Sequence, residues 1–433
     1  MTPNGDLASM QPEDHAAKPH PRARPIVLSL KQHDGSPAAG VAVTVRQTRD
    51  RFLFGSNAFG LADGETDARR ERYRERFADL FNFATLPFYW GQYERASGEP
   101  AYARLHGMAT WCRQHGIVPK GHTLCWHNVP PKWVADMPLD TQHRLQMQRV
   151  TREVTAFRSL VDMWDVVNEA VATPTHERAP NPMTRLVRQH GVVPILKEAF
   201  TAARQANPEA ILLLNDFDHW SGNYEQLIEQ CLAAGVPIDA IGIQSHMHNG
   251  YIGRDRVLEV CESLGRFGKP IHWTEVSLIS GEPHPDNNWH TQLPDWYSTP
   301  DGEARQANEV VDFYTTLYGC PHVEAITWWD LADGQWLGAP SGLLRADLTP
   351  KPAYTALRKL IRETWAFAPV SVRTDAVGQV TFRAPPGDYV CDAPGYMPIE
   401  WAIEQPTGTS AINLTLARDV PPPGNTPGDT VKN

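Results

Sequence analysis

The segment AILLLND (210–216) is a short apolar run that ends in two polar side chains. Seven more short, apolar segments resemble it, and they are RFLFGSN (51–57), FATLPF (83–88), VPKGHTL (118–124), MWDVVNE (163–169), AIGIQSH (240–246), PIHWTEV (270–276) and AITWWD (325–330). Strands that are apolar on both faces are typical of a parallel sheet buried on both sides. The eight segments are therefore predicted to be the strands of one parallel sheet.

Longer amphipathic patterns lie between these strands and predict helices. Examples are TDARRERYRERFADLF (66–81), AYARLHGMATWCRQHG (101–116) and TQHRLQMQRVTREVTAFRSL (141–160), and KPAYTALRKLIRETW (351–365) follows the eighth strand. Eight strand–helix units over about 310 residues predict an α/β fold, a (β/α)8 TIM barrel at 49–366. An open doubly wound sheet is the alternative, but GSNAFG (55–60) after the first strand lacks the GxGxxG turn expected there.

Two accessory β segments, 25–48 and 367–418, flank the predicted barrel. IVLSLKQHDGSPAAGVAVTVRQ (26–47) alternates apolar and polar residues around an Asp-Gly pair and predicts a β-hairpin. Alternation with Gly and Pro-Pro-Gly turns recurs in 370–396, and the two pieces together resemble the carboxypeptidase regulatory-like β-sandwich. One hypothesis is a small sandwich into which the barrel is inserted, and the alternative is two separate β-appendages. The polar segments 1–24 and 419–433 are predicted to be disordered tails.

Composition and charge narrow the class of partner. The 433 residues are 41% hydrophobic and 21% charged, as in ordinary soluble globular proteins, and the formal net charge is −10. Such a charge argues against nucleic acid or an anionic membrane as a partner. We expect a polysaccharide or oligosaccharide substrate, because the 14 Trp offer flat apolar faces that suit sugar rings. We also expect the protein to be a monomer.

Neither the cysteines nor the start of the chain adds a structural motif. The six cysteines contain no CxxC pair, which removes zinc-ribbon and redox-motif interpretations and gives no disulfide framework. No run of 18 apolar residues predicts a membrane span. Since residues 1–25 do not resemble a signal peptide, we expect a cytoplasmic protein or one whose export signal lies outside this chain.

Polar side chains gather where the predicted strands end, which is where catalytic groups lie in a barrel. They are His122, Asn168, Glu169, Asp216, Gln244, Ser245, His246, Glu275, Trp329 and Asp330, with Trp126 and Trp336 just beyond. Glu169 after the fourth strand and Glu275 after the seventh are predicted to face each other across the barrel mouth. Glycoside hydrolysis needs two such carboxyl groups, and their separation decides between retention and inversion.

A metal site is the competing interpretation of the same histidines. His122, His246, His248 and Asp330 contain suitable zinc ligands. Barrel metallohydrolases place a His-x-His after the first strand, where this chain has GSN (55–57). We therefore expect neither a metal nor a cofactor.

The motifs at these strand ends resemble glycoside hydrolase family 10, the xylanase family. They are GHTLCWH (121–127), WDVVNEA (164–170), LLLNDF (212–217), IDAIGIQSHMH (238–248), WTEV (273–276), ITWWDLAD (326–333) and LTPKPAY (348–354). The resemblance implies a retaining mechanism with Glu169 as general acid/base and Glu275 as nucleophile. It also implies that the sugar next to the scissile bond is held or lined by His122, Trp126, Asn168, Gln244, His246, Trp329 and Trp336.

One segment departs from the family pattern. After the second strand the family carries Glu-Asn-x-x-Lys-Trp, whose Asn and Lys bind glycone sugars, whereas this chain has LPFYWGQYE (86–94). Asn128-Val129 likewise replaces a Ser-Gln pair. Two explanations stay open: Phe88, Tyr89, Trp90 and Gln92 rebuild a xylose subsite, with Tyr89 and Trp90 binding substrate, or the substrate is another β-linked glycan or glycoside.

The polar and aromatic stretch 281–302 after the seventh strand is predicted to be a loop on the active face, where it would favour short oligosaccharides by walling off part of the site. Three functions remain: a β-1,4-xylanase or xylo-oligosaccharide hydrolase, a family-10-like β-glycosidase with another glycone, and a non-catalytic carbohydrate-binding barrel. We place xylan first because the matching site residues outnumber the missing ones.

Overall fold

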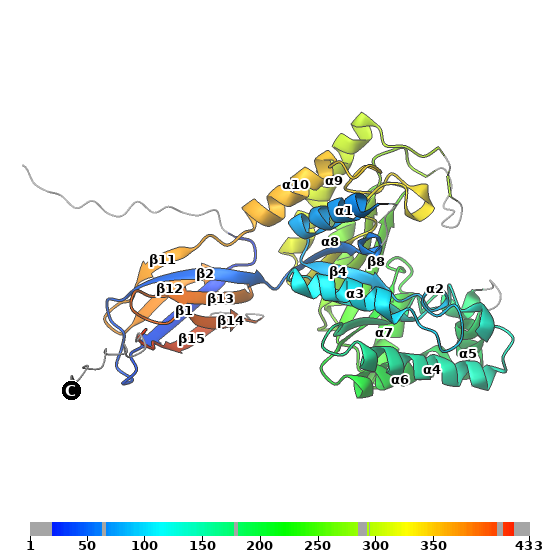
Figure 1. Cartoon of the computed structure of the whole chain (residues 1–433), viewed down its shortest axis with the longest axis horizontal. Helices are drawn as coiled ribbons and strands as arrows, with labels where there is room; N and C mark the ends of the chain where they lie inside the picture. The colour runs from blue at the N-terminus through cyan, green and yellow to red at the C-terminus, as the bar shows by residue number, and fades with distance from the viewer. Residues whose placement is uncertain are drawn as a thin grey trace, which may run out of the picture. The chain divides into compact units, whose positions relative to one another are not determined.

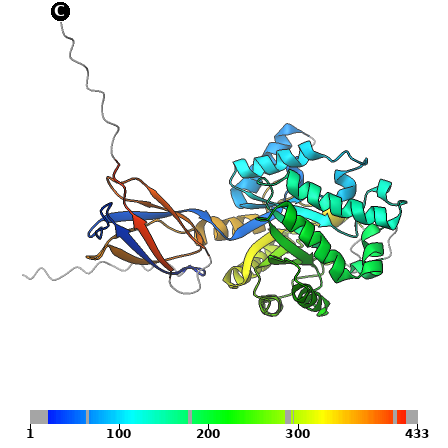
Figure 2. The same ribbon diagram turned by 90° about the horizontal axis from the view of Figure 1, so that it is seen from below.

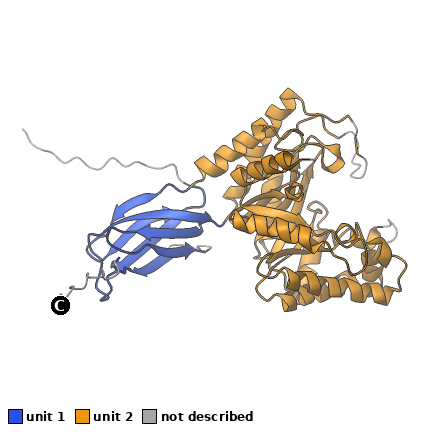
Figure 3. Ribbon diagram, in the orientation of Figure 1, with its two compact units in different colours: residues 1–51, 367–433 blue, residues 52–366 orange. Residues whose placement is uncertain are grey.

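The computed structural model describes residues 20–62, 66–176, 181–284, 292–293, 295–404 and 410–419 (Figure 1). The chain divides into two compact units, one made of residues 1–51 and 367–433 and the other of residues 52–366 (Figure 3). Most of the predicted tails, 1–19 and 420–433, lie outside the described residues.

The larger unit is a closed barrel of eight parallel strands in the order β10-β3-β4-β5-β6-β7-β8-β9. Each strand overlaps one of the predicted segments, so the predicted (β/α)8 fold is confirmed. The strands are β3 (Leu53–Asn57), β4 (Phe83–Pro87), β5 (Val118–Cys125), β6 (Met163–Asn168), β7 (Ile211–Asp216), β8 (Ala240–Met247), β9 (Ile271–Leu278) and β10 (Val323–Trp328).

Helices surround these strands (Figure 2). They are α1 (Asp67–Leu80), α2 (Trp90–Tyr93), α3 (Tyr102–Gln114), α4 (Leu139–Ala156), α5 (Pro182–His190), α6 (Val192–Ala206), α7 (Asn223–Ala233), α8 (Arg254–Gly265), α9 (Pro300–Gly319) and α10 (Pro352–Lys359). Several begin at sequence signals for a helix start: the Thr299 hydroxyl caps α9 by accepting from the Gly302 N–H, with Pro300 next in the chain. In the described chain, no helix is long and apolar enough to cross a bilayer.

Close packing between neighbouring strands fixes the barrel under the site. The fully buried Trp164 of β6 lies against Gly121 of β5, where a Cβ would stand 2.2 Å from the indole ring. Phe88 packs on the other side of the same indole, with ring centroids 4.8 Å apart. Only glycine fits at position 121, which explains the small residue directly before His122.

The smaller unit contains two sheets with one common apolar core. Its strands are β1 (Arg24–Lys31), β2 (Ala42–Asp50), β11 (Val370–Arg373), β12 (Gln379–Ala384), β13 (Gly387–Asp392), β14 (Ile399–Ile403) and β15 (Ser410–Thr415). The sheets have the orders β12-β1-β15 and β11-β2-β13-β14. Each N-terminal strand is thus flanked on both sides by strands from the C-terminal part of the chain.

The predicted hairpin over 26–47 is wrong, because β1 and β2 lie in different sheets. The Asp-Gly turn exists, with the Gly35 N–H donating to the Gln32 carbonyl at 2.9 Å, but the chain then crosses to the other sheet. The crossing lets Ile26 and Leu28 of β1 face the same core as Val43 and Val45 of β2. The alternation of apolar and polar residues shows which face of each strand is buried. A hairpin and a pair of strands in two facing sheets both satisfy this alternation.

We predict that a chain starting at Phe52 loses the fold of 367–418, because it lacks the middle strand β1 of one sheet and the inner strand β2 of the other. Limited proteolysis followed by mass spectrometry measures this. Cleavage is expected throughout 367–418 in the truncated chain and in neither sheet of the full chain. Equal protection of 367–418 in both chains would contradict the observed strand order.

Candidate active site

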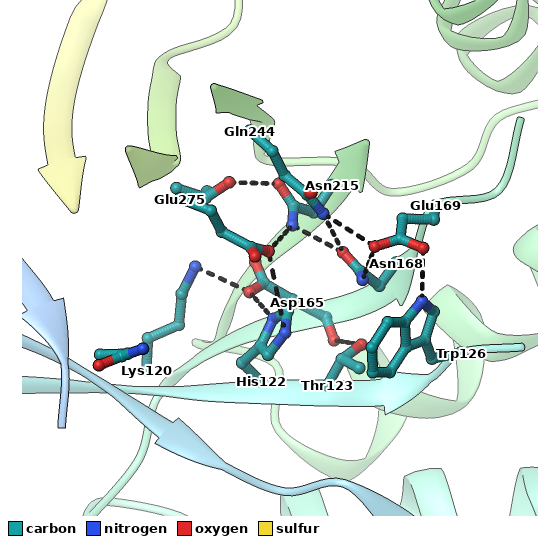
Figure 4. Close-up of polar contacts among 12 residues, drawn as sticks. Lys120, His122, Thr123, Trp126, Asp165, Asn168, Glu169, Asn215, Gln244 and Glu275 are labelled. Atoms are coloured by element: carbon teal, nitrogen blue, oxygen red, sulfur yellow. Dashed lines mark hydrogen bonds and ion pairs between the residues drawn. The ribbon is translucent and has the colours of Figure 1, made fainter. Parts of the chain in front are cut away.

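The carboxyl ends of β4 to β10 bring most of the predicted site residues together at one mouth of the barrel, and Figure 4 shows those that follow β5, β6, β8 and β9. Glu169 follows β6, and Glu275 lies within β9. Figure 4 shows the two carboxylates on opposite sides of a group of amide side chains, Asn168, Asn215 and Gln244.

Glu169 is held in place by its backbone and by several donors. Its φ is +56°, a conformation that costs free energy in a non-glycine residue, and its N–H donates to the Asn215 carbonyl at 2.8 Å. The carboxylate accepts from Trp126 Nε1 at 2.8 Å and from Gln244 Nε2 at 3.2 Å. Burial raises the pKa of Glu169 to about 8, and the negative charge of Glu275 acts in the same direction while the Trp126 hydrogen bond opposes it. The carboxyl group therefore keeps its proton at neutral pH.

Glu275 has a different set of neighbours. Asn215 Nδ2 donates to its Oε1 at 3.1 Å, and Nε2 of His246 lies 3.2 Å from its Oε2. The other ring nitrogen of His246, Nδ1, lies 3.0 Å from the Ser277 hydroxyl oxygen. A carboxylate oxygen can only accept, so the His246 nitrogen that faces Glu275 carries the hydrogen.

The amides join the two carboxylates in one chain of hydrogen bonds. Gln244 Nε2 faces both Glu169 Oε1 and Asn168 Oδ1, at 3.2 and 3.3 Å. Asn215 Nδ2 in turn donates to Asn168 Oδ1 at 2.7 Å as well as to Glu275. Thr274 fixes the orientation of the Asn215 amide by donating to its Oδ1 at 2.6 Å. Asn215 thus belongs to the site, although the sequence analysis assigned it no role.

Lys120 and Asp165 are further site residues that the sequence analysis missed. Lys120 Nζ lies 2.7 Å from Asp165 Oδ2, and the same oxygen lies 2.8 Å from His122 Nδ1. Burial raises the pKa of Asp165, but the charge of Lys120 and the contact with His122 outweigh it and lower that pKa below its usual value. Asp165 is therefore ionised and orients His122 towards Glu275, whose Oε1 is 3.8 Å from His122 Nε2. A signal was present, because each is a charged residue inside an otherwise apolar strand.

Aromatic rings enclose the site on the side of Glu275. Tyr89 lies 5.5 Å from the ring of His122 and 5.3 Å from that of Trp126, between ring centroids. Trp329 stands edge-on to His122 at 5.5 Å, and Trp336 lies 4.3 Å from His246. Burial and the nearby carboxylates, Glu275 first among them, raise the pKa of Tyr89 well above its usual value. Its phenol remains a hydrogen-bond donor.

Trp90 contacts none of these rings, and its predicted role in binding substrate stays a prediction. Its indole N–H donates to Glu94 Oε2 at 2.9 Å, and its ring lies 5.5 Å from the guanidinium carbon of the buried Arg149. Phe88 is also buried in the core. Since α2 begins at Trp90, the chain turns directly after Tyr89 and leaves Tyr89 as the aromatic residue of 86–94 that contacts the site rings.

Arg149 of α4 fixes the strand ends on which His122 and Tyr89 stand. Its guanidinium donates to the backbone carbonyls of Phe88, Thr123 and Leu124. The position of Tyr89 thus depends on a buried cation that lies far from it in the sequence.

The stretch 281–302 is described in part, since 285–291 and 294 lie outside the described residues. The ring of Trp296 lies 5.6 Å from that of His248, which in turn is 5.2 Å from Trp336. The described part of the loop therefore reaches the rings beside the site, and α9 begins at Pro300 within the predicted stretch.

Among the described residues, no group of three or more His, Cys, Asp or Glu is arranged to hold a metal ion. Asp330, one of the possible ligands, accepts hydrogen bonds from Asn57 Nδ2 and, at 2.9 Å, from the Trp336 N–H. All six cysteines are buried.

We predict that Glu169→Gln stabilises the protein at high pH. The folded-state pKa of about 8 exceeds the usual value of 4.5, so wild type loses stability as pH rises from 4.5 to 8, because ionisation is costlier in the folded state. Glutamine stays neutral, so the variant should gain on the order of 5 kcal/mol relative to wild type at pH 9 and little at pH 4.5.

Thermal unfolding at several pH values measures this difference, with Glu229→Gln on the exposed surface of α7 as the control. A Tm difference between Glu169→Gln and wild type that does not change between pH 4.5 and pH 9 would show that Glu169 is not held protonated.

Comparison with known proteins agrees with the strand-end motifs. A sequence model of glycosyl hydrolase family 10 matches residues 54–360. Endo-1,4-beta-xylanase B of Cellvibrio japonicus is 28% identical over 268 residues, which cover 62% of this chain and 40% of that protein. Endo-1,4-beta-xylanase B of Thermotoga neapolitana is 26% identical over 332 residues, which cover 72% of this chain and 88% of that protein.

Solved structures show the same fold. Xylanase 10B of Thermotoga petrophila, in complex with xylobiose, has a TM-score of 0.62 and 23% identity, with 73% of this chain and 95% of that chain covered. Because the family model matches nearly the whole barrel, the chain belongs to glycosyl hydrolase family 10.

Proposed function

We propose that the protein hydrolyses β-1,4-linked xylan or xylo-oligosaccharides by double displacement, with retention at the anomeric carbon. The observation that carries the proposal is the pair of carboxyl groups in unlike surroundings: Glu169 is protonated by burial, and Glu275 is contacted by N–H donors of Asn215 and His246. A protonated acid beside a carboxylate nucleophile is what the first step of a retaining glycosidase requires.

In the first step Glu169 donates its proton to the glycosidic oxygen while Glu275 attacks the anomeric carbon. The bond to the leaving sugar breaks with its electron pair on that oxygen, and a bond forms from the anomeric carbon to a Glu275 oxygen. Glu169 is then ionised. It accepts a proton from water, the water oxygen bonds to the anomeric carbon, and the Glu275 carboxylate leaves.

The surrounding groups suit these two steps. Asn215 and His246 hold Glu275 at a fixed angle, so little motion is needed for attack. The Trp126 N–H and the Gln244 amide stabilise the Glu169 carboxylate after it has given up its proton. Asn168 accepts from Asn215 and Gln244 at its Oδ1 and donates from its Nδ2 to Glu169 Oε1 at 3.1 Å. Its second amide N–H is left to donate to a hydroxyl of the bound sugar.

The part of the site that binds the glycone sugar supports a second candidate function with the same reaction chemistry. The segment 86–94 supplies one aromatic phenol, Tyr89, in place of an amide and an ammonium group, and each lost donor costs about 1–3 kcal/mol when the sugar hydroxyl stays buried. A glycone other than xylose is therefore the alternative. A non-catalytic barrel is the least favoured, because binding alone needs no protonated and ionised carboxyl pair. We further propose a monomer without nucleic acid or membrane partners, consistent with the net charge of −10.

Product analysis separates these functions. Wild type and Glu275→Ala are incubated with xylan, xylo-oligosaccharides, mixed-linkage glucan and arabinan, and the released sugars are identified. We expect xylo-oligosaccharides from wild type and at least about 10³-fold less from the variant, because it lacks the nucleophile. Release from another glycan alone would favour the altered glycone, and no release from any would refute hydrolysis of these glycans.

The pH profile tests the role of Glu169. Since an acid must carry its proton to act, kcat/KM for xylo-oligosaccharides should fall about tenfold per pH unit above the Glu169 pKa of about 8. A dinitrophenyl glycoside needs no protonation of its leaving group, so its fall should be absent or much weaker. The same alkaline fall for both substrates would exclude Glu169 as the acid.

A further inference from the structure

Three exposed aromatic side chains lie on the described part of the barrel, and all are in loops that follow its strands. Phe217 and Trp220 follow β7 and are 37% and 62% exposed, and Tyr297 follows β9 and is 68% exposed. Catalytic loops of a barrel are at this end. Trp220 is unusual among them, because an exposed indole is costly in water and the turn around it is tightly fixed.

Side chains of Asp216 and Asp218 hold this turn. Asp216 Oδ1 accepts from the N–H groups of Phe217 and Asp218, at 2.8 and 3.2 Å. Asp218 Oδ1 accepts from the Ser221 N–H at 3.1 Å, and its Oδ2 accepts from the Ser221 hydroxyl. The turn is therefore ordered without any ligand, which reduces the entropy lost when a ligand binds.

The ring of His219 packs against the indole of Trp220. Its ring centroid lies 3.6 Å from that of Trp220, and the residue is only 4% exposed. Arg256 of α8 donates to the His219 carbonyl, which fixes the backbone next to Trp220. Burial, with the nearby Arg256 charge, lowers the pKa of His219 to about 4, so its ring is neutral at pH 7. Neither ring nitrogen of this buried histidine has a hydrogen-bond partner among the described residues.

The turn begins on the Glu169 side of the site. Asp216, its first residue, accepts from the Val171 N–H at 3.0 Å, two residues after Glu169 in the chain. The rings of Trp329 and Trp336 contact the histidines around Glu275 instead. Because an acid protonates the leaving oxygen, the leaving part of the substrate extends from Glu169 away from those rings.

We propose that Trp220, supported by His219, is an outlying sugar-binding platform for the leaving-group end of a β-linked glycan. The apolar face of a pyranose ring stacks on the exposed indole, beyond the sugar whose oxygen Glu169 protonates. The ligand is a sugar further along the same chain, so the inference rests on the proposed function. The platform favours long substrates over short ones.

The test compares Trp220→Ala and Trp220→Tyr with wild type. The measured quantity is kcat/KM for xylohexaose divided by kcat/KM for an aryl β-xylobioside, which has no sugar on its leaving side. Loss of one stacked ring should lower this ratio roughly tenfold in Trp220→Ala, and Trp220→Tyr should restore most of it because a flat ring remains. Leu258→Ala, an exposed apolar position on α8, is the control and should keep the wild-type ratio.

A Trp220→Ala ratio within twofold of wild type would overturn the platform. If wild type cleaves neither substrate, the proposed function fails on its own, and affinity electrophoresis in gels that contain soluble xylan then tests Trp220 separately. Retardation of wild type that is lost in Trp220→Ala supports the platform, and equal mobility of the two proteins refutes it.

Discussion

The site depends on one chain of hydrogen bonds that runs from Glu169 through Gln244, Asn168 and Asn215 to Glu275. Each side-chain amide has two N–H donors. The Asn215 donors bind Asn168 and Glu275, and the Gln244 donors bind Asn168 and Glu169, so all four are used within this chain of hydrogen bonds. The chain keeps the carboxyl groups apart and in unlike surroundings. Two like charges in one buried site cannot both be ionised cheaply, so burial leaves the proton on Glu169.

Much of this arrangement could be predicted from the sequence, because each barrel strand can be recognised from its own residues. Its apolar run identifies the strand, and its last polar residue marks the catalytic end, which placed Glu169, Glu275 and His246 correctly at the mouth. Lys120 and Asp165 were missed because they lie inside the predicted strands, whereas site residues were sought only where the strands end. A buried charge in a strand requires a partner, and that rule would have paired them.

Contacts between distant segments could not be predicted. Trp90 and Tyr89 are equally aromatic neighbours, and only the start of α2 and the buried Arg149 decide that Tyr89 contacts the site. The hairpin error has the same cause. Alternation along β1 and β2 gives each strand a buried face, but the choice of partner strand depends on 367–419, which completes both sheets.

In the proposed mechanism Glu275 is the nucleophile and Glu169 is not. Incubation with a 2-deoxy-2-fluoro xylobioside that carries a good leaving group slows breakdown of the glycosyl-enzyme, and peptide mass spectrometry then locates the sugar. One sugar adduct per chain is expected, on the peptide that contains Glu275, and activity should be lost at the rate at which the adduct forms. An adduct on Glu169, or inactivation without any adduct, would contradict this mechanism.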